Sequence, residues 1–528
     1  SGGEMEAAMA GMGPDLTAPP PPCAIARASR GGTLPAAAPA ADVARQAPSL
    51  APIGGVPAAA PAVAASPSKR ARVEVPRPPL RVAIAGGGLG GLALAAALQQ
   101  VGITATVYER DHQFDDRRQG YGLTLTNSRK GPLAHLGLLD ACIERDCPSC
   151  WHWVFNASGE ILGYYGRAFS QEVPANGAAA ADAAAKPAGR RGERGNLRIP
   201  RQDLRQMLLD KVTPDSVVWG RRITAYDERD DGVTVHLDGG GTAEADVLVG
   251  ADGIRSVVRR LREEKDAARG SKGVAAGLRY SGIAVIIGLS TADHPLLDAG
   301  GFYALDGLHR LFTMPFRLSD GKTPQLTMWQ LSFSGLPEEA ARGLGTLSAA
   351  ELLGEANRRT AGWFEPVGAL VNGTPVLPGS VWATALYDRE PLPPRPRDHG
   401  SLVTVIGDAA HPMTMFKGQG ANQALCDAPL LARWLSKPGK LTPDAVRTRL
   451  RCFEREMTAR STPKVMGSRE AAARLHRREV LDDGFGVEGV DEAHTTELLH
   501  HLRDAGVTAA LGPDLVAAVA KNIAAFHA

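Results

Sequence analysis

The spacing of hydrophobic residues along the chain predicts both strands and helices. Leu80–Ala85 and Ala105–Tyr108 are short apolar runs, which are typical of strands buried in a parallel sheet. Between them, LALAAALQQVG predicts a helix rich in leucine and alanine. Residues 279–289 (RYSGIAVIIGL) and 325–333 (QLTMWQLSF) predict strands of a second sheet. From Gly418 onward the spacing becomes helical, as in ANQALCDAPLLARWL and DLVAAVAKNIAAF.

Two segments lack the large apolar residues that a folded core requires. Residues 1–76 are rich in alanine and proline, and residues 173–196 contain AAAADAAAKPAGRRGERG. Such segments cannot offset the entropy lost on ordering by burying apolar surface. We therefore predict a disordered arm at 1–76 and a flexible surface insertion at 173–196. The basic cluster Lys69–Arg72 within the arm is interpreted as a solvated linker rather than as a nuclear-localisation signal.

Charge and cysteine content narrow the classes of function. The 528 residues include 59 basic and 57 acidic side chains, a net charge of +2, which argues against general binding to nucleic acid. No uncharged apolar run reaches about 18 residues, so no transmembrane segment is predicted. Six cysteines in so long a chain indicate a reducing compartment. We expect an intracellular, cytoplasmic location, with a plastid or mitochondrion, reached through the arm, as the alternative.

Three cysteines have a spacing that is also found in metal sites. Cys142, Cys147 and Cys150 form C-x4-C-x2-C, the spacing of three ligands in plant-type iron–sulfur proteins, and His152 follows closely. The next cysteine is Cys426, far from the position of the fourth ligand in that pattern. Partly buried thiols are the better interpretation, and no metal site is predicted.

A glycine-rich turn after the first strand is the clearest sign of chemistry. Gly86–Gly91 satisfies G-x-G-x-x-G and leads directly into the predicted helix. In that motif the first glycine permits a tight turn, the second lets a pyrophosphate approach the backbone, and the third lets helix and strand pack closely. The second strand ends at Glu109, 18 residues after Gly91, where a carboxylate can bind both hydroxyls of an adenosine ribose. Because Glu109 would repel a 2′-phosphate, FAD or NAD is favoured over NADP here, with Arg110 placed to contact adenine or phosphate.

Two further motifs follow in order. Asp246–Gly253 is an apolar strand ending in a DG turn, and Val403–Asp408 is another apolar strand ending in an acid, before AAHPMTMFKGQGAN. Taken singly, each is equally consistent with a strand end capped by aspartate. Together with the glycine-rich turn, and over about Leu80–Lys464, they resemble the group A FAD-dependent aromatic monooxygenases of the p-hydroxybenzoate hydroxylase fold, in particular the salicylate-hydroxylase-like branch.

The resemblance implies roles for individual residues. Asp408 would bind a ribitol hydroxyl of FAD, Arg201 would contact the phosphate region, and Gly122 would lie near the isoalloxazine. GQGAN opens a helix, whose N–H groups and dipole suit the negative charge of reduced flavin. With Arg110 added, the predicted cofactor-binding residues are Gly86, Gly88, Gly91, Glu109, Arg110, Gly122, Arg201, Asp252, Gly253, Asp408, Gly418, Gly420, Ala421 and Asn422.

The resemblance also implies the reaction. FAD would take a hydride from NADPH or NADH as a transient donor, react with O2 and form a C4a-hydroperoxyflavin that hydroxylates or epoxidises a small to medium organic, aromatic substrate. The protein would orient the substrate and exclude water. Two alternatives stay open. One is a flavin-dependent reductase or dehydrogenase on the same fold, and the other is a flavin-binding protein whose arm serves an interaction partner.

Candidates for catalysis and substrate binding follow from the same comparison. His411 is a candidate base, with ordering of its loop as the alternative, and Met415 stands where the family usually has a proline. The residues proposed to line an apolar substrate cavity, with packing as the alternative, are Phe302, Tyr303, Met314 and Trp329. Trp151–Trp153 resembles the start of the halogenase motif W-x-W-x-I-P, but Val154–Asn156 breaks it, so halogenation is not predicted.

The predicted fold is α/β, with a Rossmann-like FAD-binding domain interleaved with a mixed β-sheet substrate domain and followed by a helical C-terminal region. The predicted segments are 1–76 (disordered arm), 77–172 (FAD-binding βαβ segment), 173–196 (flexible insertion), 197–275 (FAD-binding continuation with the DG motif), 276–399 (substrate-binding sheet), 400–464 (GD motif and following helix) and 465–528 (C-terminal helices).

Overall fold

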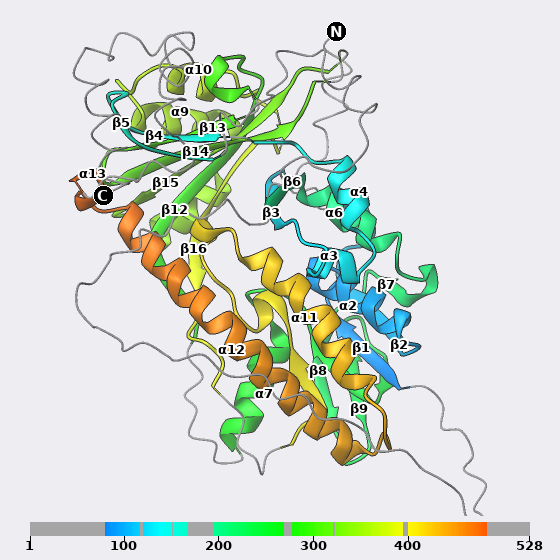
Figure 1. Cartoon of the computed structure of the whole chain (residues 1–528). Helices are drawn as coiled ribbons and strands as arrows, with labels where there is room; N and C mark the ends of the chain where they lie inside the picture. The colour runs from blue at the N-terminus through cyan, green and yellow to red at the C-terminus, as the bar shows by residue number, and fades with distance from the viewer. Residues whose placement is uncertain are drawn as a thin grey trace, which may run out of the picture. The chain divides into compact units, whose positions relative to one another are not determined.

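The computed structural model describes residues 80–116, 120–149, 151–166, 195–268, 277–298, 300–319, 321, 323–377, 379–393 and 400–482. The predicted arm, most of the predicted insertion and residues 483–528 of the predicted C-terminal helices lie outside these ranges. Within the described ranges the chain forms two large sheets, two smaller ones and the helices that pack on them (Figure 1).

A five-stranded parallel sheet carries the glycine-rich turn. Its strand order is β17-β11-β1-β2-β7, and each neighbouring pair is parallel. The strands are β1 (Arg81–Ala85), β2 (Thr104–Glu109), β7 (Val217–Trp219), β11 (Val247–Gly250) and β17 (Val403–Val405). Helix α2 (Leu89–Gln100) joins β1 to β2, and residues 92–98 of that helix are all buried. The predicted strand, turn, helix and strand are confirmed, and the carboxyl ends of β1, β2, β11 and β17 meet at one edge of the sheet.

The second large sheet has seven strands in the order β16-β12-β15-β14-β13-β4-β5. The strands are β4 (Trp151–Asn156), β5 (Ile161–Gly166), β12 (Arg279–Ser290), β13 (Gly300–Leu305), β14 (His309–Arg317), β15 (Leu326–Ser334) and β16 (Val381–Asp388). The strands predicted at 279–289 and 325–333 are confirmed as β12 and β15. The range predicted for this sheet, 276–399, was too short, because β4 and β5 also belong to it. β4 pairs in parallel with β13, and a pairing so distant in sequence leaves no local signal.

The two faces of the seven-stranded sheet pack on different partners, because successive side chains of a strand point to opposite faces. One face, which carries Phe302 and Trp329, packs on the helices α8 (Glu338–Gly343), α9 (Ala349–Arg359) and α10 (Val367–Asn372). We call the opposite face, which carries Tyr303, Phe312, Met314 and Met328, the inner face. It contacts a strand pair formed by β3 (Gly122–Thr126) and β6 (Asn196–Pro200), since the Gly122 N–H lies 3.3 Å from Sδ of Met328.

The other elements complete the framework. A three-stranded sheet is formed by β8 (Ile223–Glu228), β9 (Val233–Leu237) and β10 (Thr242–Ala245). In the described part of the chain the other α-helices are α3 (Pro132–His135), α4 (Leu139–Glu144), α6 (Arg201–Leu209), α7 (Val257–Ala268), α11 (Gly420–Leu435), α12 (Pro443–Leu475) and α13 (Glu479–Asp482). Short 3-10 turns are η1 (Phe114–Asp116), η3 (Pro214–Ser216), η4 (Pro295–Leu297), η5 (Leu344–Thr346), η6 (Gly407–Ala409) and η7 (Met415–Lys417).

Figure 1 shows α11 and α12 side by side, and α12 runs without a break across the segment boundary predicted at 464/465. Across the described ranges, no helix combines the length and the hydropathy needed to cross a bilayer.

A buried ion pair ties α12 to α7. The Glu454 carboxylate accepts hydrogen bonds from the two terminal nitrogens of Arg262 at 2.8 and 3.0 Å, and from Oγ1 of Thr404 at 2.7 Å. The side chains of Arg262 and Glu454 are 5% and 7% exposed. Removing one member of such a pair leaves the other charge buried and uncompensated, so we expect the loss of either side chain alone to destabilise the packing of the helices on the parallel sheet.

Candidate functional site

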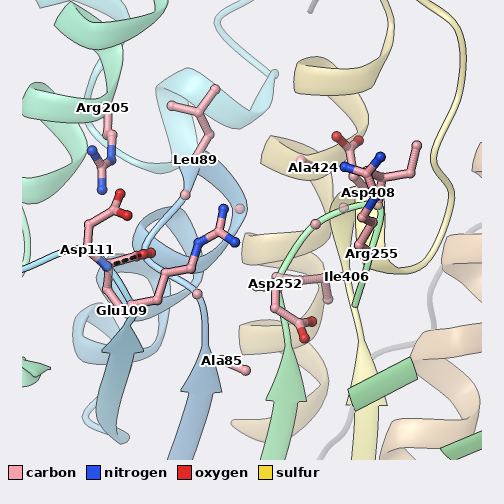
Figure 2. A pocket seen from close by; sticks show the side chains of 18 of the residues that line it. Ala85, Leu89, Glu109, Asp111, Arg205, Asp252, Arg255, Ile406, Asp408 and Ala424 are labelled. Atoms are coloured by element: carbon pink, nitrogen blue, oxygen red, sulfur yellow. Dashed lines mark hydrogen bonds between the residues drawn. The ribbon is translucent and has the colours of Figure 1, made fainter. Parts of the chain in front are cut away.

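A cavity of about 330 Å³ lies at the carboxyl ends of the parallel strands (Figure 2). Its wall combines the glycine-rich turn, the end of β2, the start of α6, the DG turn, the GD turn and the start of α11. The parallel sheet brings these distant segments to one edge, where ligands of open α/β sheets bind. The predicted cofactor-binding residues that line the cavity are Gly86, Gly88, Glu109, Arg110, Arg201, Asp252, Gly253, Asp408, Gly420 and Ala421. Those that do not line it are Gly91, Gly122, Gly418 and Asn422.

The three glycines of the turn meet three different requirements. Gly86 has φ +99°, which favours glycine over residues with a side chain. A Cβ on Gly91 would lie 1.9 Å from the carbonyl oxygen of Gly86, so α2 can pack on the turn only because this side chain is absent. A Cβ on Gly88 would meet nothing within 4 Å, so the missing side chain leaves room in the cavity. Gly88 is also the N-cap of α2, whose free N–H groups and positive dipole end therefore face that room.

Two carboxylates stand at the end of β2. Oε2 of Glu109 accepts from the Gly87 N–H at 2.5 Å, and Oε1 accepts from the Asp111 N–H at 3.0 Å. Glu109 thus holds the glycine-rich turn as well as lining the cavity. Asp111 also lines the cavity, and its pKa is raised by burial and by Glu109, with Arg205 acting in the opposite direction. Figure 2 shows the Arg205 guanidinium pointing toward Asp111.

Positive charge in the cavity wall comes from more arginines than the sequence motifs indicated. Arg205 was not predicted, although it follows Arg201 by one helical turn of α6 and both line the cavity. Its Nε donates to the carbonyl of Gly87 at 3.1 Å, and Nη1 donates to the carbonyl of Phe114 at 3.0 Å. Burial lowers the pKa of Arg205, and Arg201 lowers it further. The other arginines that line the cavity are Arg110, Arg222 and Arg255. The R-x-x-x-R spacing in α6 was the available signal for Arg205.

The Asp252 carboxylate caps a helix rather than standing unengaged in the cavity. Oδ2 accepts from the backbone N–H of Val257 at 2.7 Å and of Val258 at 3.3 Å, and Oδ1 accepts from the Ser256 hydroxyl. These bonds satisfy N–H groups at the start of α7. Burial is the largest influence on Asp252 and raises its pKa. The DG turn therefore shapes the cavity wall mainly through its backbone. Gly253 adopts φ +80°, and the space that its Cβ would occupy is open.

The start of α11 forms the opposite wall. Gly420, Ala421 and Ala424 line the cavity, together with Gly407 and Asp408 of the GD turn. Figure 2 shows Asp408 beside Arg255, apart from the Glu109 and Asp111 pair. Small side chains at the first turn of α11 leave its N–H groups accessible to a ligand.

Asn422 holds the neighbouring loop instead of lining the cavity. Its Nδ2 donates to the carbonyls of Thr124 and Gly418, at 2.9 and 3.0 Å, and its Oδ1 accepts from the Thr126 N–H at 2.9 Å. The amide therefore ties β3 to the turn in which Gly418 adopts φ +58°. This arrangement places the predicted turn residue Gly418 against the start of α11.

The candidate base His411 is buried behind the GD turn. Its side chain is 3% exposed, it does not line the cavity, and its Nε2 lies 2.8 Å from Oδ2 of Asp427. Met415, at the position where the family usually has a proline, is buried in η7 just before Gly418. His411 is thus placed to order its loop, while its role in catalysis stays a prediction.

The four candidate substrate residues divide between the two faces of the seven-stranded sheet. Phe302 packs against Phe155 and Phe364, and the Trp329 indole N–H donates to Oγ1 of Thr374 at 2.8 Å, on the face covered by α8, α9 and α10. Tyr303 and Met314 lie on the inner face. A Cβ on Gly122 would be 2.7 Å from Cε of Met314, which places Met314 directly against β3.

Two of the three cysteines of the motif, Cys142 and Cys147, belong to the described ranges. Over the described ranges, no three His, Cys, Asp or Glu side chains are grouped as metal ligands, and Cys150 lies outside those ranges. Cys142 and Cys147 are buried, and His152 is buried with a pKa that burial lowers well below its usual value.

Burial also predicts that both thiols are unreactive in the folded protein. It raises the pKa of Cys142 to about 12 and that of Cys147 to about 11, so both stay protonated at pH 8. We expect iodoacetamide at pH 8 to leave both residues unmodified in the native protein and to alkylate both after denaturation, as followed by peptide mass spectrometry. Rapid alkylation of either thiol in the native state would contradict this assignment.

The glycine-rich and DG turns fall within a recognised sequence family. Residues 79–278 match the family described as "FAD binding domain". Among curated relatives, 3-amino-4-hydroxybenzoate 2-monooxygenase PtmB3 of Streptomyces platensis is 32% identical over 361 residues, covering 67% of this chain and 78% of the relative. The 6-hydroxynicotinate 3-monooxygenase of Pseudomonas fluorescens is 31% identical over 366 residues, covering 68% of this chain and 83% of the relative.

Solved structures are similar in fold. HpxO of Klebsiella pneumoniae, complexed with FAD and uric acid, has a TM-score of 0.58 and 22% identity, covering 84% of this chain and 96% of that chain. A salicylate hydroxylase substrate complex has a TM-score of 0.57 and 23% identity, covering 82% of this chain and 98% of that chain. At these identities the likeness establishes the fold alone.

Proposed function

Because the chain belongs to the FAD-dependent aromatic monooxygenases, we propose that the cavity at the edge of its parallel sheet is the FAD site. The observation that carries this placement is the cavity wall itself, in which the glycine-rich, DG and GD turns meet the N-termini of α2 and α11. The protein is an oxidoreductase of the monooxygenase class.

The lining residues suit the parts of a flavin dinucleotide. Open space at Gly88, beside the N-terminus of α2, suits a pyrophosphate, and Arg201 and Arg205 add positive charge next to it. Glu109 suits the adenosine ribose hydroxyls. At the other end, Asp408 suits a ribitol hydroxyl, and the first turn of α11 presents N–H groups toward the flavin ring. These lining groups support the proposal that the pyrophosphate, the adenosine ribose, the ribitol chain and the flavin ring bind in this cavity.

When bound, FAD would supply the redox chemistry, which is acceptance of a hydride from NADPH or NADH and oxygenation of the substrate with O2. The residues of the chain bind and orient FAD and the substrate, and they keep water away from both. We assign the substrate to the space between the flavin and the inner face, so Tyr303 and Met314 are the favoured contacts among the four candidates. Phe302 and Trp329 support the sheet from its other side.

The buried arginine Arg310 on the inner face indicates which class of substrate to propose. The Arg310 guanidinium is 0% exposed, and it lies 4.7, 5.0 and 5.2 Å from the ring centres of Tyr303, Phe312 and Phe416. Phe416 belongs to η7, immediately before the Gly418 turn. A buried cation bordered by aromatic rings suits a planar aromatic substrate that carries an anionic group. We propose a hydroxylated aromatic carboxylate, the kind of compound named in the relatives.

The function is tested by substrate-dependent turnover. The protein is supplied with NADPH or NADH, O2 and a panel of probes comprising 3-amino-4-hydroxybenzoate, 6-hydroxynicotinate, salicylate and the same rings without the carboxyl group. We expect a carboxylated probe to stimulate NAD(P)H oxidation with matching O2 uptake and incorporation of one labelled oxygen atom. Oxidation of NAD(P)H without O2, with reduction of the added acceptor, would instead indicate a reductase.

We expect Asp408→Ala to purify with little FAD. The change removes a charged hydrogen-bonding group from the cavity wall, which costs about 1.5–3 kcal/mol of cofactor binding, or about 10- to 100-fold in Kd. Flavin content per protein, measured by absorbance after release, tests this expectation. Wild-type flavin content in Asp408→Ala would remove Asp408 from the site.

We also propose a cytoplasmic location, with an organelle reached through the N-terminal arm as the alternative. The described cysteines Cys142, Cys147, Cys426 and Cys452 form no disulfide, as a reducing compartment favours. Cell fractionation of the full chain distinguishes the two locations.

A further inference from the structure

Asp427 is a fully buried carboxylate that lies next to the cavity without lining it. It belongs to α11 and is 0% exposed. Its Oδ2 accepts from the backbone N–H of Gly407 at 2.8 Å and from Nε2 of His411 at 2.8 Å, and its Oδ1 accepts from Arg460 of α12. Burial raises the pKa of Asp427, but His411, Arg460 and the Gly407 N–H together lower it by more. The carboxylate is therefore charged at neutral pH and bound by three donors from two segments, the GD turn with the loop after it, and α12.

The segment that Asp427 holds is the GD turn. Gly407 and Asp408, which belong to the 3-10 turn η6, both line the cavity. Asp427 binds the N–H at the start of this turn. At its end, Nη1 of Arg259, a side chain only 2% exposed, donates to the carbonyls of Ala409 and Ala410 at 3.2 and 2.8 Å. A buried anion and a buried cation thus fix the two ends of the turn that presents Asp408.

Helix α11 connects this support directly to the cavity wall. Ala424, three residues before Asp427, lines the cavity, and a Cβ on Gly407 would lie 3.2 Å from the Ala424 Cβ. Residues three apart share a helix face, so the same face packs on the turn and binds its N–H. A shift of the Asp427 side chain would therefore move Asp408 relative to the wall formed by α11.

We propose that Asp427 is a positioning residue for FAD, which holds the Gly407 N–H so that Asp408 projects into the cavity in the geometry that cofactor binding requires. This inference rests on the proposed placement of FAD and extends it to a residue that no cofactor atom needs to touch. The alternative is a purely structural role, in which Asp427 only joins α11 to α12 through Arg460.

The experiment compares Asp427→Asn with Glu454→Gln. Each change neutralises a buried carboxylate that binds an arginine, but the Glu454 contacts, Arg262 and Thr404, do not line the cavity. An asparagine keeps the size of Asp427 but has one acceptor oxygen, so it loses either the Arg460 bond or the two bonds from Gly407 and His411, which share Oδ2. Arg460→Gln removes the Arg460 bond and leaves Oδ2 with Gly407 and His411, so under the proposal it should keep the wild-type Kd. We expect the apoprotein of Asp427→Asn to bind FAD about 10- to 100-fold more weakly, by fluorescence titration, and the visible circular dichroism of the bound flavin to change. Glu454→Gln should lower the melting temperature yet keep the wild-type Kd and spectrum.

Each outcome separates the two roles. Wild-type Kd and circular dichroism in Asp427→Asn would overturn the inference, as would an equal loss of affinity in Glu454→Gln. Should Asp427→Asn fail to fold, His411→Ala removes one donor and should raise the Kd for FAD by about threefold or more, and an unchanged Kd would again overturn the inference. A wild-type apoprotein that binds no FAD would overturn the proposed function instead.

Discussion

Gly88→Val is expected to give a folded protein that has lost FAD. The backbone at Gly88 has φ −76° and ψ −174°, which any residue adopts, and a Cβ there meets no atom within 4 Å. A valine side chain would instead fill the room beside the N-terminus of α2, where the pyrophosphate is proposed to approach the backbone. Because this displaces two or more hydrogen bonds to a charged group, FAD affinity should fall at least about 100-fold. The melting temperature of the apoprotein should stay close to that of the wild-type apoprotein.

The matched control is Gly354→Val. Gly354 lies on an exposed position of α9, and a Cβ there also meets nothing within 4 Å. We expect this variant to keep wild-type flavin content, as measured by absorbance of the purified protein. Full flavin content in Gly88→Val would contradict the placement of FAD in this cavity.

Gly91→Ala should produce the largest loss of stability. Its Cβ would lie 1.9 Å from the Gly86 carbonyl oxygen and 3.4 Å from the Cβ of Ala251. The first contact is with backbone, so no change of rotamer relieves it, and α2 must move away from the glycine-rich turn. Forced overpacking typically costs about 1–3 kcal/mol, and we expect about 3 kcal/mol or more here because backbone must shift.

The neighbouring Gly90→Ala provides the control for this prediction. Its Cβ would meet the Ala424 Cβ at 3.6 Å, an ordinary van der Waals contact. Thermal unfolding of the two apoproteins should therefore show a drop of about 5 °C or more for Gly91→Ala and little change for Gly90→Ala. Equal melting temperatures would mean that close packing of α2 on the turn is not needed for stability.

The parallel sheet could be predicted because its signals are local. Leu80–Ala85, the glycines and Glu109 follow one another within a single β–α–β unit, and the DG and GD strands are short apolar runs ending in aspartate. Parallel strands bring their carboxyl ends to one edge, so the meeting of these motifs followed from the fold class. The membership of β4 and β5 in the second sheet could not be predicted, because β4 pairs with β13 well over a hundred residues later.

The site could be predicted less completely than the fold, because the motif residues and the cavity-lining residues overlap only in part, and a motif does not determine what its side chains bind. Asn422 and Asp252 belong to the motifs, yet their side chains bind β3 and the start of α7. Arg205 and Asp111 line the cavity, yet they lie outside the motifs. A sequence pattern shows which residues a turn needs, whereas the direction of each side chain depends on contacts with distant segments, as the hydrogen bonds of Asp427 show.

The central claim is that this cavity holds FAD, and the visible absorption spectrum of the purified wild-type protein tests it most directly, together with identification of any chromophore released by heat. We predict the two-band spectrum of oxidised flavin and release of FAD, with Gly88→Val purifying colourless under the same conditions. A colourless wild-type protein that cannot be reconstituted with FAD would contradict the account.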